Sequence, residues 1–142
     1  MSMLEDYFEK PYWVIDFLPE QVPEGGEGQI FAIEKYYLKQ PQRGELQKKF
    51  LDILLKLNCY YDFEVWPLDH INCEINPAPE VLEEWMVKME EVLNIMLPSV
   101  NSLIVTQPDD LYMTVYNPNQ RLLELLQQLA HAQGLFVWNP EP

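Results

Sequence analysis

The sequence predicts an α+β fold, a two-layer sandwich in which a mixed, mostly antiparallel sheet carries its helices mainly on one face. Short segments rich in β-branched and aromatic residues are interspersed with longer amphipathic segments, but not in strict strand–helix alternation. The chain also has twelve prolines and five glycines, residues that favour turns between such segments. Because hydrophobic residues make up 48% of a chain of 142, we expect residues 1–142 to form a single domain around one core.

The first part of the chain predicts two strands joined by a loop. Residues 12–18 (YWVIDFL) are dense in β-branched and aromatic side chains and are followed by Pro19. A polar, glycine-containing loop leads to residues 29–38 (QIFAIEKYYL), which we interpret as a second strand, although their Ile-Phe-x-Ile spacing also suits a helix. With a short loop between them, the two strands would form an antiparallel pair.

A helix and a strand follow. Residues 44–57 place large apolar side chains at three- and four-residue steps, which is typical of an amphipathic helix. In residues 61–65 tyrosine, phenylalanine and valine alternate with Asp62 and Glu64. This alternation predicts a half-buried strand with both carboxylates on its solvent-facing side.

A second helix is expected after an irregular stretch at residues 67–79. Asn76 is the predicted N-cap, with Pro77 or Pro79 in the first turn. The apolar spacing that follows continues to Leu97, where the next proline ends it.

The last third predicts a hairpin, a helix and a closing strand. Residues 102–106 and 111–116 flank a QPDD turn, and Asn117 precedes a proline as the N-cap of a leucine-rich helix. Gly134 is placed to end that helix, and residues 135–138 (LFVW) form the last strand. The predicted order is therefore β β α β α β β α β.

The last two helices are expected to pack on the same face of the sheet. Their apolar stripes should then be buried together. The predicted shared core is Leu82, Trp85, Met86, Met89, Leu93, Leu122, Leu126 and Leu129.

The charge is large and uneven. The formal net charge is −14, with ten acidic and seven basic residues in 1–57 but thirteen acidic and two basic residues in 58–142. Such a surface repels nucleic acid and anionic membranes, and either serves solubility or attracts a basic protein partner. The residues predicted to meet that partner are Asp62, Glu64, Trp66, Asp69, Glu74, Asp109 and Asp110.

Several features indicate a cytoplasmic protein. Residues 1–10 (MSMLEDYFEK) are acidic and lack the apolar stretch of a secretory signal, and no apolar run is long enough to span a bilayer. Cys59 and Cys73 are the two cysteines, without a CxxC motif, as expected for a reducing compartment.

Catalytic and metal-binding patterns are sparse, so we expect no cofactor and no enzymatic activity. None of the serines lies in a G-x-S-x-G motif, and the glycines at 25–28 enter a predicted strand, unlike a phosphate-binding loop. His70 and Cys73 have a spacing that suits two zinc ligands or a nucleophile–base pair, but no second Cys/His pair completes a site. Ordinary loop packing is the alternative that we favour for both.

The strands also carry many tyrosines and tryptophans. Because successive side chains of a strand point to opposite faces, some of these aromatic residues must point away from the helices. Aromatic side chains among carboxylates suit a protein-binding surface, and simple burial or a homodimer contact are the alternatives.

Residues 109–140 (DDLYMTVYNPNQRLLELLQQLAHAQGLFVWNP) resemble the C-terminal part of many small uncharacterised bacterial α+β proteins. Some of those are assigned as immunity proteins that neutralise secreted toxins. They more often end on Asp-Pro, where this chain has Asn139 and Pro140. The resemblance implies a non-catalytic binding protein of the immunity or antitoxin kind, and the acidic charge suits the masking of a basic toxin. The alternative is an accessory protein that acts as a homodimer or as a subunit of a complex.

Overall fold

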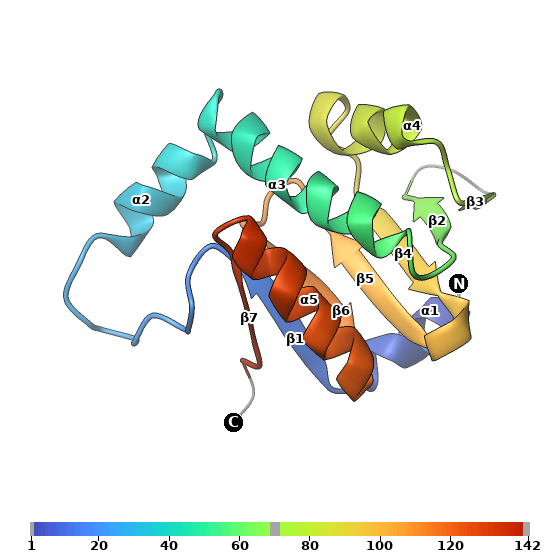
Figure 1. The fold of residues 1–142 in the computed structure, drawn as a ribbon. Coiled ribbons are helices and arrows are strands. Elements are labelled where there is room, and N and C mark those ends of the chain that lie inside the picture. The colour runs from blue at the N-terminus through green and yellow to red at the C-terminus, as the bar shows by residue number, and fades with distance from the viewer. Residues whose placement is uncertain (1, 69–71, 141–142) are drawn as a thin grey trace.

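A seven-stranded sheet forms the centre of the computed structural model, which describes residues 2–68 and 72–140 (Figure 1). The strands lie in the order β3-β2-β4-β5-β6-β1-β7, and every pairing among the described residues is antiparallel. The predicted α+β class is therefore confirmed. The strands are β1 (Tyr12–Asp16), β2 (Glu64–Pro67), β3 (Glu74–Ile75), β4 (Leu93–Leu97), β5 (Ser102–Thr106), β6 (Tyr112–Tyr116) and β7 (Phe136–Trp138).

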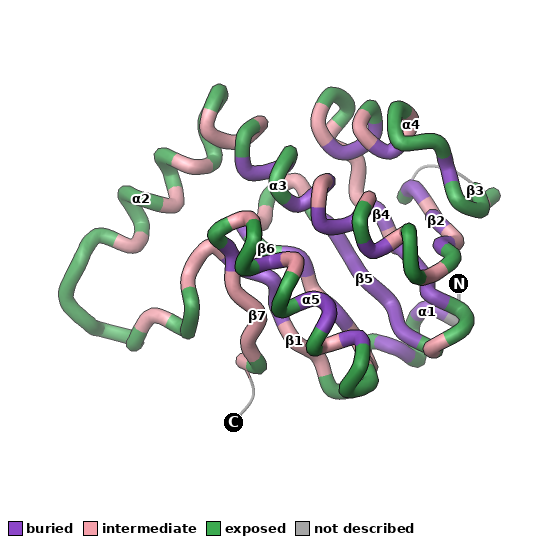
Figure 2. Tube along the Cα trace, in the orientation of Figure 1, coloured by how far each residue is buried: buried purple, intermediate pink, exposed green. Residues whose placement is uncertain are grey.

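The main helices cover one face of this sheet. The α-helices are α1 (Ser2–Glu5), α2 (Ile30–Tyr37), α3 (Gln42–Leu57), α4 (Pro79–Glu83) and α5 (Gln120–Ala132). Shorter segments are the 3₁₀ helices η1 (Asp6–Glu9) and η3 (Pro98–Val100) and the π-helical turn η2 (Glu84–Lys88). Figure 1 shows α3 and α5 side by side over the sheet, whereas α2 projects away from it. Between these helices and the sheet lies the main core, and Figure 2 shows its buried residues along the central strands and along α3 and α5.

The predicted strand at residues 29–38 is wrong, because this segment forms helix α2. β1 is hydrogen-bonded to β6 on one side and to β7 on the other, so neither side is open to a strand from the following segment. The apolar spacing of this segment is compatible with a strand and with a helix. Because β1 has no free edge for pairing, the segment forms a helix.

The predicted second helix is confirmed in having Pro79 in its first turn, and it is wrong in its N-cap and beyond Lys88. Its N-cap is Ala78, not Asn76, which has a φ of +47° and accepts a hydrogen bond of 2.8 Å from the Phe63 amide. Glu90 has a φ of +54°, which ends the helical run, and β4 then forms between β2 and β5. Its residues 93, 95 and 97 face the helices and are fully buried.

The predicted core is confirmed except at two positions. The prediction that Met89 is buried is wrong, since this residue follows the π-helical turn and is 55% exposed. Leu129 packs against the core but is only half-buried. The remaining members are buried, namely Leu82, Trp85, Met86, Leu93, Leu122 and Leu126.

Local signals at the ends of α5 explain its bounds. Its N-cap is Asn119, whose side chain accepts a hydrogen bond of 2.8 Å from the Leu122 amide, so the prediction of Asn117 is wrong. Asn117 has a φ of +58° and donates from its side chain to the carbonyl of Asn101. Gly134, at a φ of +74°, ends the helix as predicted, and the Leu135 amide then bonds back to the helix.

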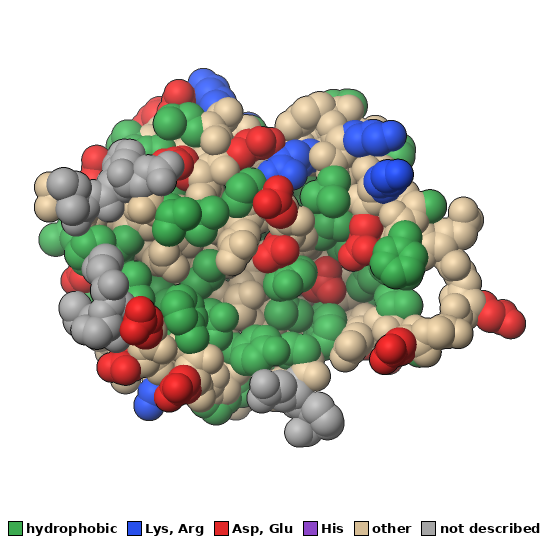
Figure 3. All heavy atoms as spheres, turned by 180° about the vertical axis from the view of Figure 1, so that it is seen from behind, with side chains coloured by type: hydrophobic (Ala, Val, Ile, Leu, Met, Phe, Trp, Pro, Cys, Tyr) green, Lys and Arg blue, Asp and Glu red, His purple; other side chains and the backbone are tan. Residues whose placement is uncertain are grey.

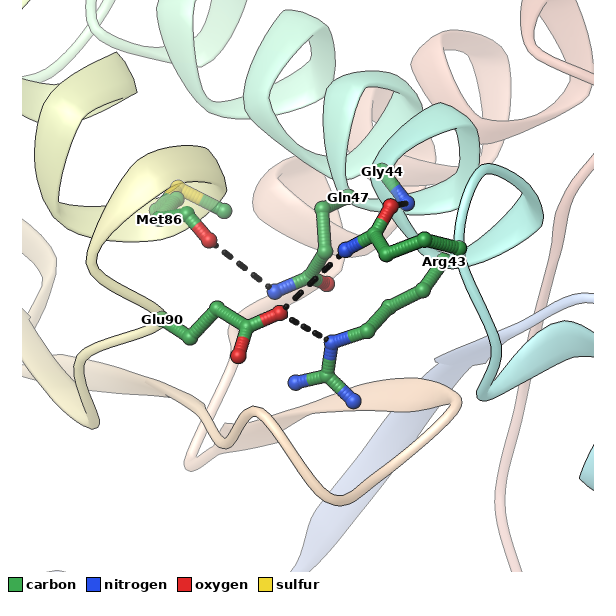
Figure 4. Close-up of polar contacts among 6 residues, drawn as sticks. Arg43, Gly44, Gln47, Met86 and Glu90 are labelled. Carbon is green, nitrogen blue, oxygen red and sulfur yellow. Dashed lines mark hydrogen bonds and ion pairs between the residues drawn. The ribbon is translucent and has the colours of Figure 1, made fainter.

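A cluster of polar contacts fixes the start of α3 against the chain after α4 (Figure 4). The Arg43 guanidinium donates from Nε to the Glu90 carboxylate at 2.6 Å, and the Arg43 side chain is only 11% exposed. Gln47 donates to the carbonyl of Met86 at 3.4 Å. Both contacts hold the backbone where Glu90 turns out of the helical run.

Within residues 2–68 and 72–140, no helix has the length and apolar character that a membrane-spanning helix needs.

Candidate binding site on the open face of the sheet

The face of the sheet opposite α3 and α5, which we call the rear face, is shown in Figure 3. The antiparallel register places its side chains in rows across the strands. One row runs Glu64, Met96, Leu103, Tyr116 and Tyr12. A second row runs Trp66, Asn94, Val105, Thr114, Val14 and Trp138, and a shorter third row runs Tyr112, Asp16 and Phe136.

The N-terminal segment covers only part of this face. Leu4 and Tyr7 form a small buried cluster with Met96, Leu103 and Val105. The Tyr7 hydroxyl also donates to the side chain of Asn101. Beyond the contact of Phe8 with Tyr116, the part of the rear face built by β6, β1 and β7 borders an open hollow.

Two open hollows lie on the rear face, on either side of the ring contact between Phe8 and Tyr116, whose centroids are 5.3 Å apart. The first, which we call the Asp16 hollow, has a volume of about 550 Å³. Its polar and aromatic walls include Asp16, Glu20, Glu34, Phe8, Tyr12, Phe17, Tyr112, Tyr116 and Trp138. The second has a volume of about 520 Å³ and is lined by residues that include Glu5, Trp66, Asn94 and Gln107.

Neither hollow is lined by a lysine, an arginine or a histidine among the described residues. Figure 3 shows acidic side chains set among hydrophobic ones on this face, with lysine and arginine toward its margins. The electrostatic potential in the hollows is therefore negative, and their apolar walls reduce its screening by water.

Asp16 is the most deeply placed carboxylate of the site. It is 8% exposed, and its Oδ1 accepts a hydrogen bond of 2.8 Å from the Phe17 amide. No described lysine, arginine or histidine forms an ion pair with it. Burial raises the pKa of Asp16 above its usual value, hydrogen bonds from the Phe17 and Leu18 backbone and from the Trp138 side chain oppose this rise, and Glu34 adds to it by repulsion.

Tyrosines from neighbouring strands surround this carboxylate. Tyr112 lies directly opposite Asp16 in the register, and Tyr12 and Tyr116 are in ring contact with centroids 5.7 Å apart. Burial raises the pKa of Tyr112, as does repulsion from Asp110, and burial also raises that of Tyr116. The phenols of Tyr112 and Tyr116 therefore stay neutral at physiological pH and present aromatic rings beside the acids.

Helix α2 forms one wall of the Asp16 hollow. Ile30 and Glu34 line it, and the rings of Phe17 and Tyr37 meet with centroids 5.2 Å apart. The loop between β1 and α2 closes a further side, and the Trp138 indole donates to the carbonyl of Leu18 at 3.1 Å. The hollow is therefore assembled from segments at both ends of the chain.

The structure places part of the predicted docking surface on the rear face. Glu64 and Trp66 lie in its first two rows, and Trp66 lines the second hollow with an indole Nε1 that has no partner among the described residues. Asp109 and Asp110 lie in the turn between β5 and β6, where burial and then Asp109 raise the pKa of Asp110.

The other predicted docking residues are not gathered there. Asp62 is exposed before β2 and accepts a hydrogen bond of 2.9 Å from Asn76. Glu74 is exposed on the edge strand β3. Asp69 lies outside the described residues, so its predicted role stays a prediction.

Of the two residues considered for zinc binding or nucleophilic chemistry, His70 and Cys73, the structure describes only Cys73. Cys73 is a free, half-buried thiol, and His70 lies outside the described residues. Within residues 2–68 and 72–140, no three histidine, cysteine, aspartate or glutamate side chains are grouped as metal ligands. The expectation that His70 and Cys73 bind no metal stays a prediction.

Sequence reasoning missed Asp16, the central residue of the site. The signal was present, because strand alternation places Tyr12, Val14 and Asp16 on one side of residues 12–18. The neighbours that bury Asp16 come from β6, β7 and α2, and a single sequence does not reveal these pairings.

Replacing Asp16 by asparagine is expected to raise the melting temperature at pH 7. Because the folded-state pKa of Asp16 is raised, the stability that protonation contributes is fully present below the ordinary aspartate pKa of about 3.9 and is lost as the pH rises through the raised value. Asp16→Asn removes that loss and keeps an acceptor for the Phe17 amide. The gain should shrink as the pH falls toward about 3.9.

Calorimetry across this pH range tests the expectation, with Glu124→Gln on exposed α5 surface as the control that removes an unburied charge. A loss of stability at pH 7, or a gain that is independent of pH, would contradict it.

Comparisons of the chain with protein-family models, with curated proteins and with solved structures gave no match.

Proposed function

We propose that this chain is a non-catalytic binding protein that docks a basic protein partner on the rear face of its sheet. The single observation behind the proposal is the make-up of the two hollows: acids and aromatic rings line them, and no cationic side chain of the described residues does. Aromatic residues beside an unpaired carboxylate are the groups that anchor cationic surfaces in protein interfaces.

The overall charge supports the same proposal. A net charge of −14 accelerates the encounter with a basic protein and disfavours nucleic acid and anionic lipid. The resemblance of residues 109–140 to parts of toxin-immunity proteins suggests the biological setting, namely masking of a basic toxin. A cytoplasmic location fits that role and belongs to the proposal.

Homodimer formation is the second candidate, and helix α2 favours it. This helix has no buried residue, and Phe31 is 83% exposed, Tyr36 54% and Ile33 44%. Exposed apolar side chains on a projecting helix suit contact with a second copy. The two candidates differ in salt dependence, because apolar contacts are nearly insensitive to ionic strength and charge-steered docking is strongly sensitive.

Charge reversal of Glu20 and Glu34 is expected to slow association with the partner by about tenfold or more at low ionic strength. Both residues line the Asp16 hollow from its loop and helix walls, and reversal makes the potential there positive. Asp62 is unsuitable for this test because it bonds to Asn76. The partner is first obtained by capture on the immobilised chain, and its association rate is then measured by stopped flow from low to high salt.

The matched control is Glu124→Lys with Glu80→Lys, which makes the same change in net charge on exposed positions of α5 and α4. The control should lower the rate far less than the Glu20 and Glu34 pair. An association rate that responds neither to salt nor to the reversal would remove the docking proposal. A salt-insensitive dimer in sedimentation velocity, lost on Phe31→Ser, would favour the homodimer.

A further inference from the structure

We infer that the Asp16 hollow is the subsite for a single arginine side chain of the basic partner, with Asp16 as the group that pairs with the guanidinium. This inference rests on the proposed function and adds to it the part of the partner that is recognised. It is argued from the burial of Asp16, from the surrounding acids and from the aromatic walls.

The carboxylate of Asp16 is buried without a counter-charge. It is 8% exposed, its hydrogen-bond donors are neutral groups of Phe17, Leu18 and Trp138, and no described lysine, arginine or histidine pairs with it. A buried carboxylate is costly unless it is paired, and its oxygens offer about four acceptor positions. Neutral donors do not balance the negative charge of the carboxylate, and a guanidinium that enters the hollow would supply the missing counter-charge.

Other acids face the same space. Glu34 from α2 repels Asp16, and Glu20 from the adjoining loop lines the hollow. The three acidic residues therefore share one hollow that no lysine, arginine or histidine of the described residues lines. A cation seated among them removes this repulsion, so the free protein holds a site whose charges become balanced when the partner binds.

The walls favour arginine over lysine. Tyr112 lies beside Asp16 in the register, and Tyr12, Tyr116 and Trp138 line the same hollow. A guanidinium is planar, stacks on aromatic faces and is less strongly hydrated than an ammonium group. It can also donate two parallel hydrogen bonds to one carboxylate. The volume of about 550 Å³ admits the side chain together with its flanking backbone.

The test uses the full chain, labelled with nitrogen-15, and two probes of equal shape. N-acetyl-arginine amide carries the guanidinium, and N-acetyl-citrulline amide replaces it by a neutral urea. We expect amide shifts at residues 16, 17, 112 and 138 on titration with the arginine probe, and binding at least about tenfold weaker for the citrulline probe. N-acetyl-lysine amide is expected to bind between the two.

Asp16→Asn should weaken binding of the arginine probe by about tenfold or more, because the substitution removes the charge and keeps the shape. Glu124→Gln, at an exposed position of α5, also removes one carboxylate charge and should change the affinity less than about twofold. If Asp16→Asn fails to fold, Glu34→Gln replaces it, with an expected weakening of about threefold.

Equal binding of the two probes, or an arginine affinity unaffected by Asp16→Asn or by its replacement Glu34→Gln, would overturn the inference. These outcomes are distinguishable from failure of the proposed function. If the arginine probe does not bind but the partner still associates with strong salt dependence, the subsite is wrong and the docking proposal stands. If the arginine probe binds as expected but no basic protein associates, the docking proposal fails instead.

Discussion

Replacing Phe50 by alanine is expected to lower the free energy of unfolding by about 3–5 kcal/mol. Phe50 lies in α3, is 1% exposed and belongs to the main core between the helices and the sheet. The substitution removes the transfer free energy of the ring and leaves a cavity that well-packed neighbours fill only partly. Urea denaturation followed by tryptophan fluorescence measures the change.

Phe31→Ala is the matched control, because it removes the same ring from α2 at a position that is 83% exposed. Its effect should stay within about 0.5 kcal/mol. A loss below about 1 kcal/mol for Phe50→Ala, or equal losses for the two variants, would contradict the position of the core.

Replacing Leu103 by alanine is expected to cost about 2–5 kcal/mol and to loosen the N-terminal segment. Leu103 is fully buried in β5, on the rear face, where it packs with Leu4 and Tyr7. The cavity therefore opens under α1 and η1, away from the main core. Hydrogen exchange should show a larger loss of amide protection in residues 4–8 than in α5.

Leu68→Ala removes the same side chain at a position that is 63% exposed and serves as the control. It should change the stability by less than about 0.5 kcal/mol. If Leu103→Ala left the protection of residues 4–8 unchanged, the N-terminal segment would not be held by this cluster.

Much of the fold could be predicted where local chemistry determines the structure. The helix at residues 44–57 and the hairpin flanking residues 107–110 are confirmed, because each has a clear hydrophobic period or turn composition. The Gly134 signal is also confirmed, since a φ of +74° suits a residue without a Cβ.

The errors fall where partners distant in the sequence decide the outcome. Residues 93–97 continue an apolar pattern that suits a helix, but pairing with β2 and β5 makes them a central strand. Residues 29–38 suit a strand by composition, but β1 already has two neighbours. In both segments tertiary pairing overrides local propensity.

Only the position of some residues of the candidate site could be predicted from the sequence. Alternation correctly set Glu64 away from the core, and aromatic residues do face away from the main helices. The sequence-based interpretation centred the acidic surface on residues 58–142, whereas the most buried acid of the site is Asp16 in β1. Burial of an acid depends on what packs against it, and that requires the sheet order.

The two outer strands of the sheet limit how another chain can attach to it. β3 has two residues and β7 has three, so each border exposes few backbone groups for the addition of a further strand. Pro140, two residues beyond β7, has no amide hydrogen to extend a ladder there. A sheet with such short edge strands resists edge-to-edge aggregation. An extended peptide would gain few main-chain hydrogen bonds at either edge of the sheet. Discrimination among binding partners therefore depends on side chains of the rear face.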